Sequence, residues 1–243
     1  MIANLIMGLV FGIWIASYTS SVFYRLPRKI PLNGIHESGF KPFCSTCKHP
    51  LKFYEYYSVI SWFFCGKTCN YCSEPINPIY RISETIVILS STLLAYYFGM
   101  NEYYFLLFIL AILLIITNSI VFSNYKIPGI LFFLIISLGG IYTTYITHEI
   151  FDWVLEGSIY IFLILLLAKF NFLKLDFESY LLLISAASWF GLRAEIFAIN
   201  LLISTCLYYL GLKLSKKAFD MKIIKLLISI SLFATTIVKS LSV

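Results

Sequence analysis

Long apolar segments separated by short polar ones dominate the chain. A helix needs about 20 apolar residues to cross the hydrocarbon core of a bilayer, and eight segments reach or approach this length. They are 2–23, 82–99, 103–121, 128–147, 153–170, 179–190, 196–212 and 223–238. The fifth carries Glu156 and the sixth is short, so seven spans remain an alternative to eight. The pattern predicts an all-α polytopic membrane protein.

The composition agrees with this interpretation. The chain is 60% hydrophobic and 12% charged, and its mean hydropathy is +0.88, whereas soluble domains carry about 25% charged residues. So few charges cannot cover a globule with polar surface, so most of its solvent must be lipid. The net charge of +6 is not gathered into a patch or stripe, which argues against nucleic-acid binding.

The distribution of basic residues predicts the orientation. If the N-terminus lies outside, the segments 24–81, 122–127, 169–178 and 213–222, with the flanking Lys225, are cytoplasmic. These segments hold 16 of the 18 Lys and Arg residues, as the positive-inside rule requires. We therefore expect a first transmembrane helix (1–24), a cytoplasmic loop domain (25–81) and a transmembrane bundle (82–243).

The cytoplasmic loop carries two C-x-x-C pairs, Cys44 with Cys47 and Cys69 with Cys72. Two such pairs at this spacing are typical of a tetrahedral four-cysteine zinc site. Disulfides are disfavoured because the cytoplasm is reducing. Since the loop is too short for much core of its own, the zinc is predicted to be structural and to supply folding energy.

Three other residues near this chemistry have simpler interpretations. Cys65 is predicted to be a spectator, although it could replace one of the four ligands. Cys206 lies within an apolar span and is expected to be a small core residue. His49 is expected to be a solvated loop residue rather than a fifth ligand.

The order of these elements resembles the bacterial prepilin peptidases, the type IV prepilin leader peptidase and N-methyltransferase family. The residues that carry the resemblance are Tyr24-Arg25-Leu26-Pro27, the two cysteine pairs, Ile60-Ser61-Trp62, Pro75 to Arg81, and Glu84. The resemblance implies a bacterial inner-membrane protein whose partners are prepilins, pseudopilins or the type IV pilus and type II secretion machinery. It implies aspartic cleavage of a basic leader and, from S-adenosylmethionine, methylation of the new N-terminus. No glycine-rich nucleotide loop is visible for that cofactor.

The first catalytic acid that the resemblance implies is missing. It would stand seven residues before Pro128, where this chain has Val121, and the nearby position that is often acidic is Ser123. No Asp or Glu occurs between Glu102 and Glu149. Because two carboxylates must share a proton in this chemistry, the gap argues against proteolysis.

The second implied acid is Asp176, at the end of Leu173-Lys174-Leu175-Asp176, where the family has a G-x-G-D turn. Asp176 is either catalytic or a solvated loop acid beside Lys174. Glu178 and Glu84 are weaker catalytic candidates, and Glu178 need not converge with Asp176.

Three functions stay open at this point. The favoured one is a degenerate family member that binds pilin-like substrates or an assembly machine without cleaving them. The second is an active peptidase with an unusual acid pair that includes Asp176, with Glu178 or Glu84. A transporter or channel is disfavoured because the spans between Glu84 and Glu178 lack the buried charges of an ion path.

Overall fold

In the part of the chain that the computed structural model describes, the regular structure is helical. The described residues are 2–32, 42–64, 66, 68–147, 154, 158, 159, 162, 169, 175–190 and 220–241. Their helices are α1 (Ile2–Arg25), the 3-10 helix η1 (Leu26–Arg28), α2 (Phe53–Tyr56), α3 (Ser58–Phe64), α4 (Ile79–Phe98), α5 (Glu102–Phe122), α6 (Gly129–Thr147), α8 (Phe177–Phe190) and α10 (Met221–Leu241). The all-helical prediction is confirmed for these residues.

Six of the predicted apolar spans coincide with α1, α4, α5, α6, α8 and α10. The predicted spans 153–170 and 196–212 lie outside the described residues, apart from a few isolated positions in the first. Three described helices are long and apolar enough to cross a membrane, over Ile2–Arg28, Glu102–Phe122 and Met221–Val238. Shorter apolar helices cover Gly129–Tyr145 and Phe177–Ala186. The helices support a membrane protein, while the count of eight spans and the orientation stay predictions.

The chain divides into two compact units, Met1–Pro128 and Gly129–Val243. This division follows packing within the chain. The domain boundaries predicted from the sequence mark where the chain passes between membrane and cytoplasm. Packing within the chain does not test those boundaries, so they stay a prediction.

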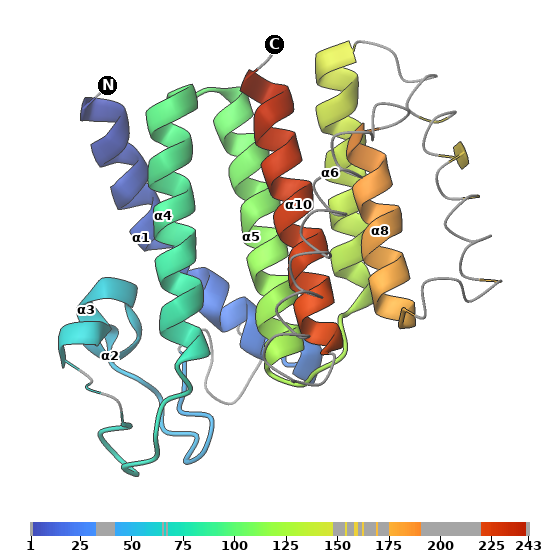
Figure 1. Ribbon diagram of the computed structural model, residues 1–243. Helices are drawn as coiled ribbons and strands as arrows, with labels where there is room; N and C mark the ends of the chain where they lie inside the picture. The colour runs from blue at the N-terminus through green and yellow to red at the C-terminus, as the bar shows by residue number, and fades with distance from the viewer. Residues whose placement is uncertain are drawn as a thin grey trace, which may run out of the picture. The chain divides into compact units, whose positions relative to one another are not determined.

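In the first unit, α1 and α5 both pack against α4, and α1 also touches α5 (Figure 1). The backbones of α1 and α4 approach closely because Gly8 has no side chain. A Cβ atom at Gly8 would lie 2.5 Å from the Cβ of Ala95. The Ser91 hydroxyl uses this approach to donate to the carbonyl of Gly8 at 2.6 Å, and it lies 2.8 Å from the hydroxyl of Tyr104. A buried polar contact therefore joins all three helices.

In the second unit, α8 packs against α6 and α10. Trp189 of α8 is fully buried, and its indole N–H donates to the carbonyl of Ile135 at 3.1 Å. Its ring lies 4.9 Å from that of Tyr142, whose hydroxyl is 2.7 Å from the hydroxyl of Ser240 on α10. These contacts fix the neighbours of α8, which carries the predicted acids at its start.

Candidate metal centre and acid cluster

Cys44, Cys47, Cys69 and Cys72 come together as one group whose Sγ atoms all lie within 4.8 Å of one another. The Sγ atoms of Cys44 and Cys72 are 3.8 Å apart. Since Zn–S bonds measure about 2.3 Å, the edge of a tetrahedral four-sulfur zinc site is about 3.8 Å. The arrangement therefore fits a structural zinc ion.

Two equivalent turns, which we call the cysteine knuckles (residues 43–50 and 68–75), present these sulfurs. In each knuckle the backbone N–H after the second cysteine donates to the carbonyl of the first, at 3.0 Å and 2.9 Å. That donor residue, Lys48 or Ser73, has a left-handed backbone with φ of 61° or 57°. An antiparallel bridge closes each turn, between Phe43 and Pro50 and between Thr68 and Pro75. The same C-x-x-C turn thus occurs twice, 25 residues apart, with the same local geometry.

The electrostatics of the group favour a cation at its centre. Burial raises the pKa of the Cys44 thiol, but backbone N–H groups of Cys47 and Thr46 outweigh this effect and lower it to about 7. A backbone hydrogen bond at Glu74 lowers the pKa of Cys72, yet burial and the neighbouring thiols raise it to about 12. One sulfur therefore ionises easily while another holds its proton, because four thiolates this close repel one another. A divalent metal ion removes that conflict.

Glu55 ties the second knuckle to α2, a role that the sequence analysis missed. Its carboxylate accepts from the amide of Asn70 at 2.9 Å, from the hydroxyl of Tyr71 at 3.2 Å and from the backbone N–H of Lys52 at 2.8 Å. Burial raises the pKa of Glu55, but these donors outweigh it and hold the pKa below its usual value. The available signal was a Glu three residues after the N-cap residue, here Lys52, of a short helix.

His49 lies at the exposed end of the first knuckle, as predicted for a loop residue. Its ring contacts that of Tyr71, with centroids 3.6 Å apart and the planes tilted by 34°, and so joins the two knuckles. Cys65 and Cys206 lie outside the described residues, and their predicted roles stay predictions.

Glu84, the third acid candidate, holds α3 against α4 through hydrogen bonds. Its carboxylate oxygen Oε2 accepts from the indole N–H of Trp62 at 2.8 Å and from the hydroxyl of Ser58 at 3.1 Å. The residue is only 6% exposed. The backbone N–H of Ser58 in turn donates to the hydroxyl of Ser17 on α1 at 2.8 Å.

A cavity of about 160 Å³ lies between this contact and the cysteine knuckles, entirely within the first unit. Its lining includes Ser20, Arg25, Trp62, Tyr80, Arg81 and Glu84. The mixture of charged, hydroxyl and aromatic groups suits a polar segment of a peptide better than a purely apolar ligand.

We expect Glu84→Ala to detach α3 by leaving the donors of half-buried Trp62 and buried Ser58 without this acceptor. The loss should amount to about 2–4 kcal/mol of stability, since two hydrogen bonds to a charged group disappear. Thermal unfolding in detergent measures it, and nicking by protease within residues 53–64 reports the local opening. Glu84→Gln should recover much of the loss through its amide oxygen, and Glu102→Ala, at an exposed position, is the control. An Ala variant as stable as the wild type would contradict this role.

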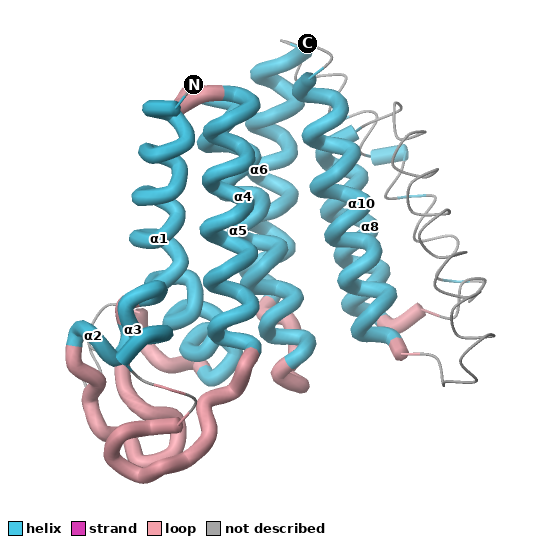
Figure 2. The backbone as a smooth tube through the Cα atoms, turned by 60° about the vertical axis from the view of Figure 1, so that its left-hand side comes forward, coloured by secondary structure: helices cyan, strands magenta, loops and turns pink. Residues whose placement is uncertain are grey.

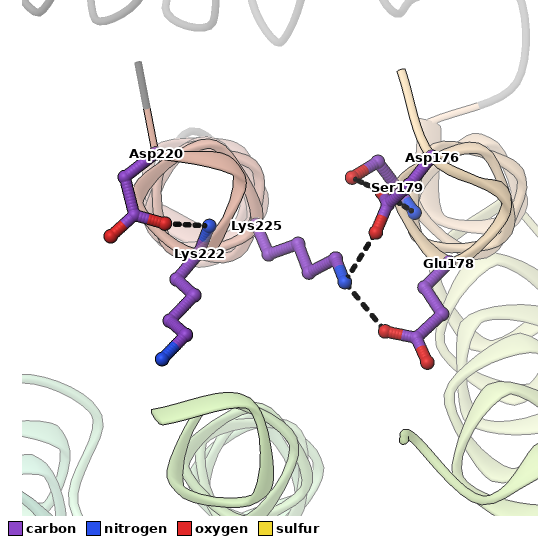
Figure 3. A network of polar contacts seen from close by, with 6 residues as sticks. All are labelled: Asp176, Glu178, Ser179, Asp220, Lys222 and Lys225. Atoms are coloured by element: carbon purple, nitrogen blue, oxygen red, sulfur yellow. Dashed lines mark hydrogen bonds and ion pairs between the residues drawn. The ribbon is translucent and has the colours of Figure 1, made fainter. Parts of the chain in front are cut away.

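In the second unit, Asp176 and Glu178 converge on one lysine (Figure 3). The Nζ atom of Lys225 on α10 lies 2.6 Å from Asp176 Oδ2 and 2.5 Å from Glu178 Oε2. The sequence analysis left their convergence open and counted Lys225 only as a basic flank, although a lysine inside the last apolar span was a signal. We call these three residues the acid cluster.

Asp176 also caps the N-terminus of α8. Its Oδ1 atom accepts from the backbone N–H of Ser179 at 3.1 Å and from the Ser179 hydroxyl. Burial raises the pKa of Asp176, but Lys225 and Ser179 outweigh that effect and hold the pKa below its usual value. The alternative, that Asp176 is a solvated acid beside Lys174, accounts neither for its contact with Lys225 nor for its contact with Ser179. Lys174 itself lies outside the described residues.

The place of the missing first acid is filled by apolar and aromatic packing. Val121 is 4% exposed within α5, and the helix ends at Phe122. In the loop that follows, the ring of Tyr125 lies 4.1 Å from the guanidinium of Arg28, which also stands 4.0 Å from the ring of Tyr24. This loop is therefore held against the end of α1 by cation–π contacts.

One comparison with known proteins found a match, and it lies in the first part of the chain. Residues 10–98 match the family model described as the bacterial Peptidase A24 N-terminal domain, the N-terminal domain of the prepilin peptidases. No curated protein and no solved structure matches the chain. The match covers α1 from residue 10 onward, both cysteine knuckles and α4, and it confirms the resemblance to prepilin peptidases over these residues.

Proposed function

We propose that this chain is a non-proteolytic member of the prepilin peptidase family. It would bind prepilins, pseudopilins or their assembly machinery at the bacterial inner membrane without removing the leader. The observation that carries this proposal is the lysine of the acid cluster, whose Nζ atom contacts both Asp176 and Glu178. The absence of any acid between Glu102 and Glu149 supports it independently.

The physical reason lies in the proton that an aspartic peptidase needs. Two carboxylates close together share one proton, so that one activates water while the other protonates the departing group. In the acid cluster the ammonium of Lys225 contacts both carboxylates and helps to lower the pKa of Asp176, which favours the ionised form of that acid. Asp176 is in addition engaged as a helix cap. The cluster is therefore suited to joining α8 to α10.

The cysteine knuckles would serve the binding function by holding a folded surface at the membrane. Cys44, Cys47, Cys69 and Cys72 are the residues that would hold zinc, which would supply folding energy and no reaction step. Methylation with S-adenosylmethionine is implied by the family resemblance alone, and this proposal does not use it.

The test is co-expression with a type IV prepilin in a host that lacks a prepilin peptidase, followed by mass spectrometry of the pilin N-terminus. We expect an intact leader, together with co-purification of the prepilin with the detergent-solubilised protein. An active prepilin peptidase in the same host is the positive control. A leader-free pilin would overturn the proposal.

The alternative, an active peptidase that uses Asp176, is favoured by one observation, the convergence of Asp176 and Glu178. If the leader is removed, Asp176→Asn should abolish the cleavage, and Glu178→Gln should identify its partner. Glu84 belongs to the other compact unit, and its pairing with Asp176 stays a prediction.

A further inference from the structure

The helix α3 ends in two large side chains that the first unit leaves uncovered. Phe63 is 82% exposed and Phe64 is 67% exposed. We call them the aromatic pair. On the adjoining α2, Phe53 is 55% exposed and Tyr54 is 39% exposed. Exposed aromatic surface gathered on one short segment marks an interaction site rather than an ordinary water-facing surface.

The segment that carries the aromatic pair has no charge to keep it in water. Residues 56–66 read YYSVISWFFCG and contain no Asp, Glu, Lys, Arg or His. The nearest acid, Glu55, is 8% exposed and accepts its hydrogen bonds from the second knuckle and the start of α2. Trp and Tyr side chains such as those of this segment are enriched at the boundary between lipid and water.

The hydrogen bonds of α3 place it beside the long helices and not beyond their ends. Ser58 is bonded to Ser17, eight residues before the end of α1 at Arg25, and Trp62 is bonded to Glu84, five residues into α4. Figures 1 and 2 both show α3 alongside α1 and α4, with the knuckle loops extending past the helix ends.

The depth of Ser17 decides which solvent surrounds α3. The 24 residues of α1 are about 36 Å long, and Ser17 lies about 12 Å from the C-terminal end. A hydrocarbon core about 30 Å thick therefore reaches the level at which α3 is attached. Near this level α1 exposes Trp14 (60%) and Tyr18 (61%). The surface of α1 is therefore aromatic and uncharged at the level where α3 is attached.

We propose that Phe63 and Phe64 insert into the lipid leaflet next to the cysteine knuckles and anchor the knuckle domain to the bilayer surface. The occupant is lipid because the pair is attached at the level of a membrane-spanning helix and lies on an uncharged segment. The anchor would hold the metal centre at a fixed depth and orientation. This inference rests on the helix contacts, the exposed aromatic side chains and the uncharged segment, and it stands whether or not the proposed function is correct.

The test places a fluorine probe, trifluoromethylphenylalanine, at one position at a time in the full chain in phospholipid nanodiscs. Relaxation by dissolved oxygen, which concentrates in lipid, is compared with relaxation by a water-soluble nickel chelate. Phe63 is the test position, Trp14 on α1 is the lipid control, and Thr46 at the tip of the first knuckle is the water control. We expect an oxygen-to-nickel ratio at Phe63 at least about fivefold above that at Thr46, as for a side chain below the headgroups.

Two results would overturn the proposal. Nickel relaxation at Phe63 as strong as at Thr46 would place the aromatic pair in water. Protection from both reagents would place it under protein, such as a second copy of the chain. Metal content and thermal unfolding of each labelled variant show whether the knuckle domain is folded, so a damaged variant is recognised and replaced by one labelled at Phe64.

Discussion

Cys69→Ser is expected to release the metal from the four-cysteine centre and to open residues 42–75 to proteases. Cys69 is the most buried of the four thiols, and its backbone carbonyl closes the second knuckle. Structural zinc contributes about 10–16 kcal/mol in small zinc domains at neutral pH, far more than the few contacts between the knuckles can replace. The helices of the bundle should stay inserted, because their packing does not involve the sulfurs.

Metal analysis of the purified protein and limited proteolysis of membranes measure this result together. Cys65→Ser is the matched control, since the sequence predicts that Cys65 is a spectator. Bound zinc near one ion per chain in the control and near zero in Cys69→Ser is the expected contrast. A Cys69→Ser loop as resistant to protease as the wild type would show that the metal is not what folds it.

The cluster of four cysteines could be predicted from the sequence because its signal is local. Each C-x-x-C turn fixes two sulfurs within a few residues, and the repeat of the pair at this spacing leaves little freedom. The apolar spans could be predicted for the same reason, because their signal is the mean hydropathy of one continuous segment. The predicted limits of the helices differ from the observed ones by only a few residues for α1 and α5.

The partners of the acids could not be predicted, because they depend on contacts between distant segments. Glu84 was read as a catalytic candidate, but it accepts hydrogen bonds from Ser58 and Trp62, more than 20 residues earlier in the chain. Asp176 meets Lys225 only because α10 packs against α8. Counting the charged residues in a sequence does not show which of them come into contact in the fold.

Lys225→Met is expected to destabilise the protein at neutral pH and to reduce the loss of stability that acid causes. The substitution leaves the carboxylates of Asp176 and Glu178 close together without a counter-ion. Loss of one partner of a fully buried pair costs about 3–5 kcal/mol, and a smaller value of roughly 1–3 kcal/mol applies here because Asp176 is 40% exposed.

The sign of the pH response follows from the pKa of Asp176. In the wild type this pKa is lowered, so the stabilisation is complete above the unfolded value of about 3.9 and is lost as the pH falls through the folded value. In Lys225→Met the ammonium that helps to lower the pKa of Asp176 is gone, so the variant lacks this acid-sensitive stabilisation. The destabilisation of the variant is then largest above about pH 4 and shrinks as the pH falls further, because the wild type loses there the stabilisation that the variant already lacks.

The unfolding temperatures of both proteins, followed from pH 7 down to about pH 2, should therefore converge below about pH 4, with the variant gaining relative to the wild type. Lys222→Met is the matched control, because Lys222 lies on the same helix and points away from the two carboxylates (Figure 3); its curve should run parallel to that of the wild type. A constant gap between Lys225→Met and the wild type would mean that Lys225 acts through its apolar stem and not through its charge. Convergence would establish that the ammonium of Lys225, and not a shared proton, holds the two carboxylates together at neutral pH.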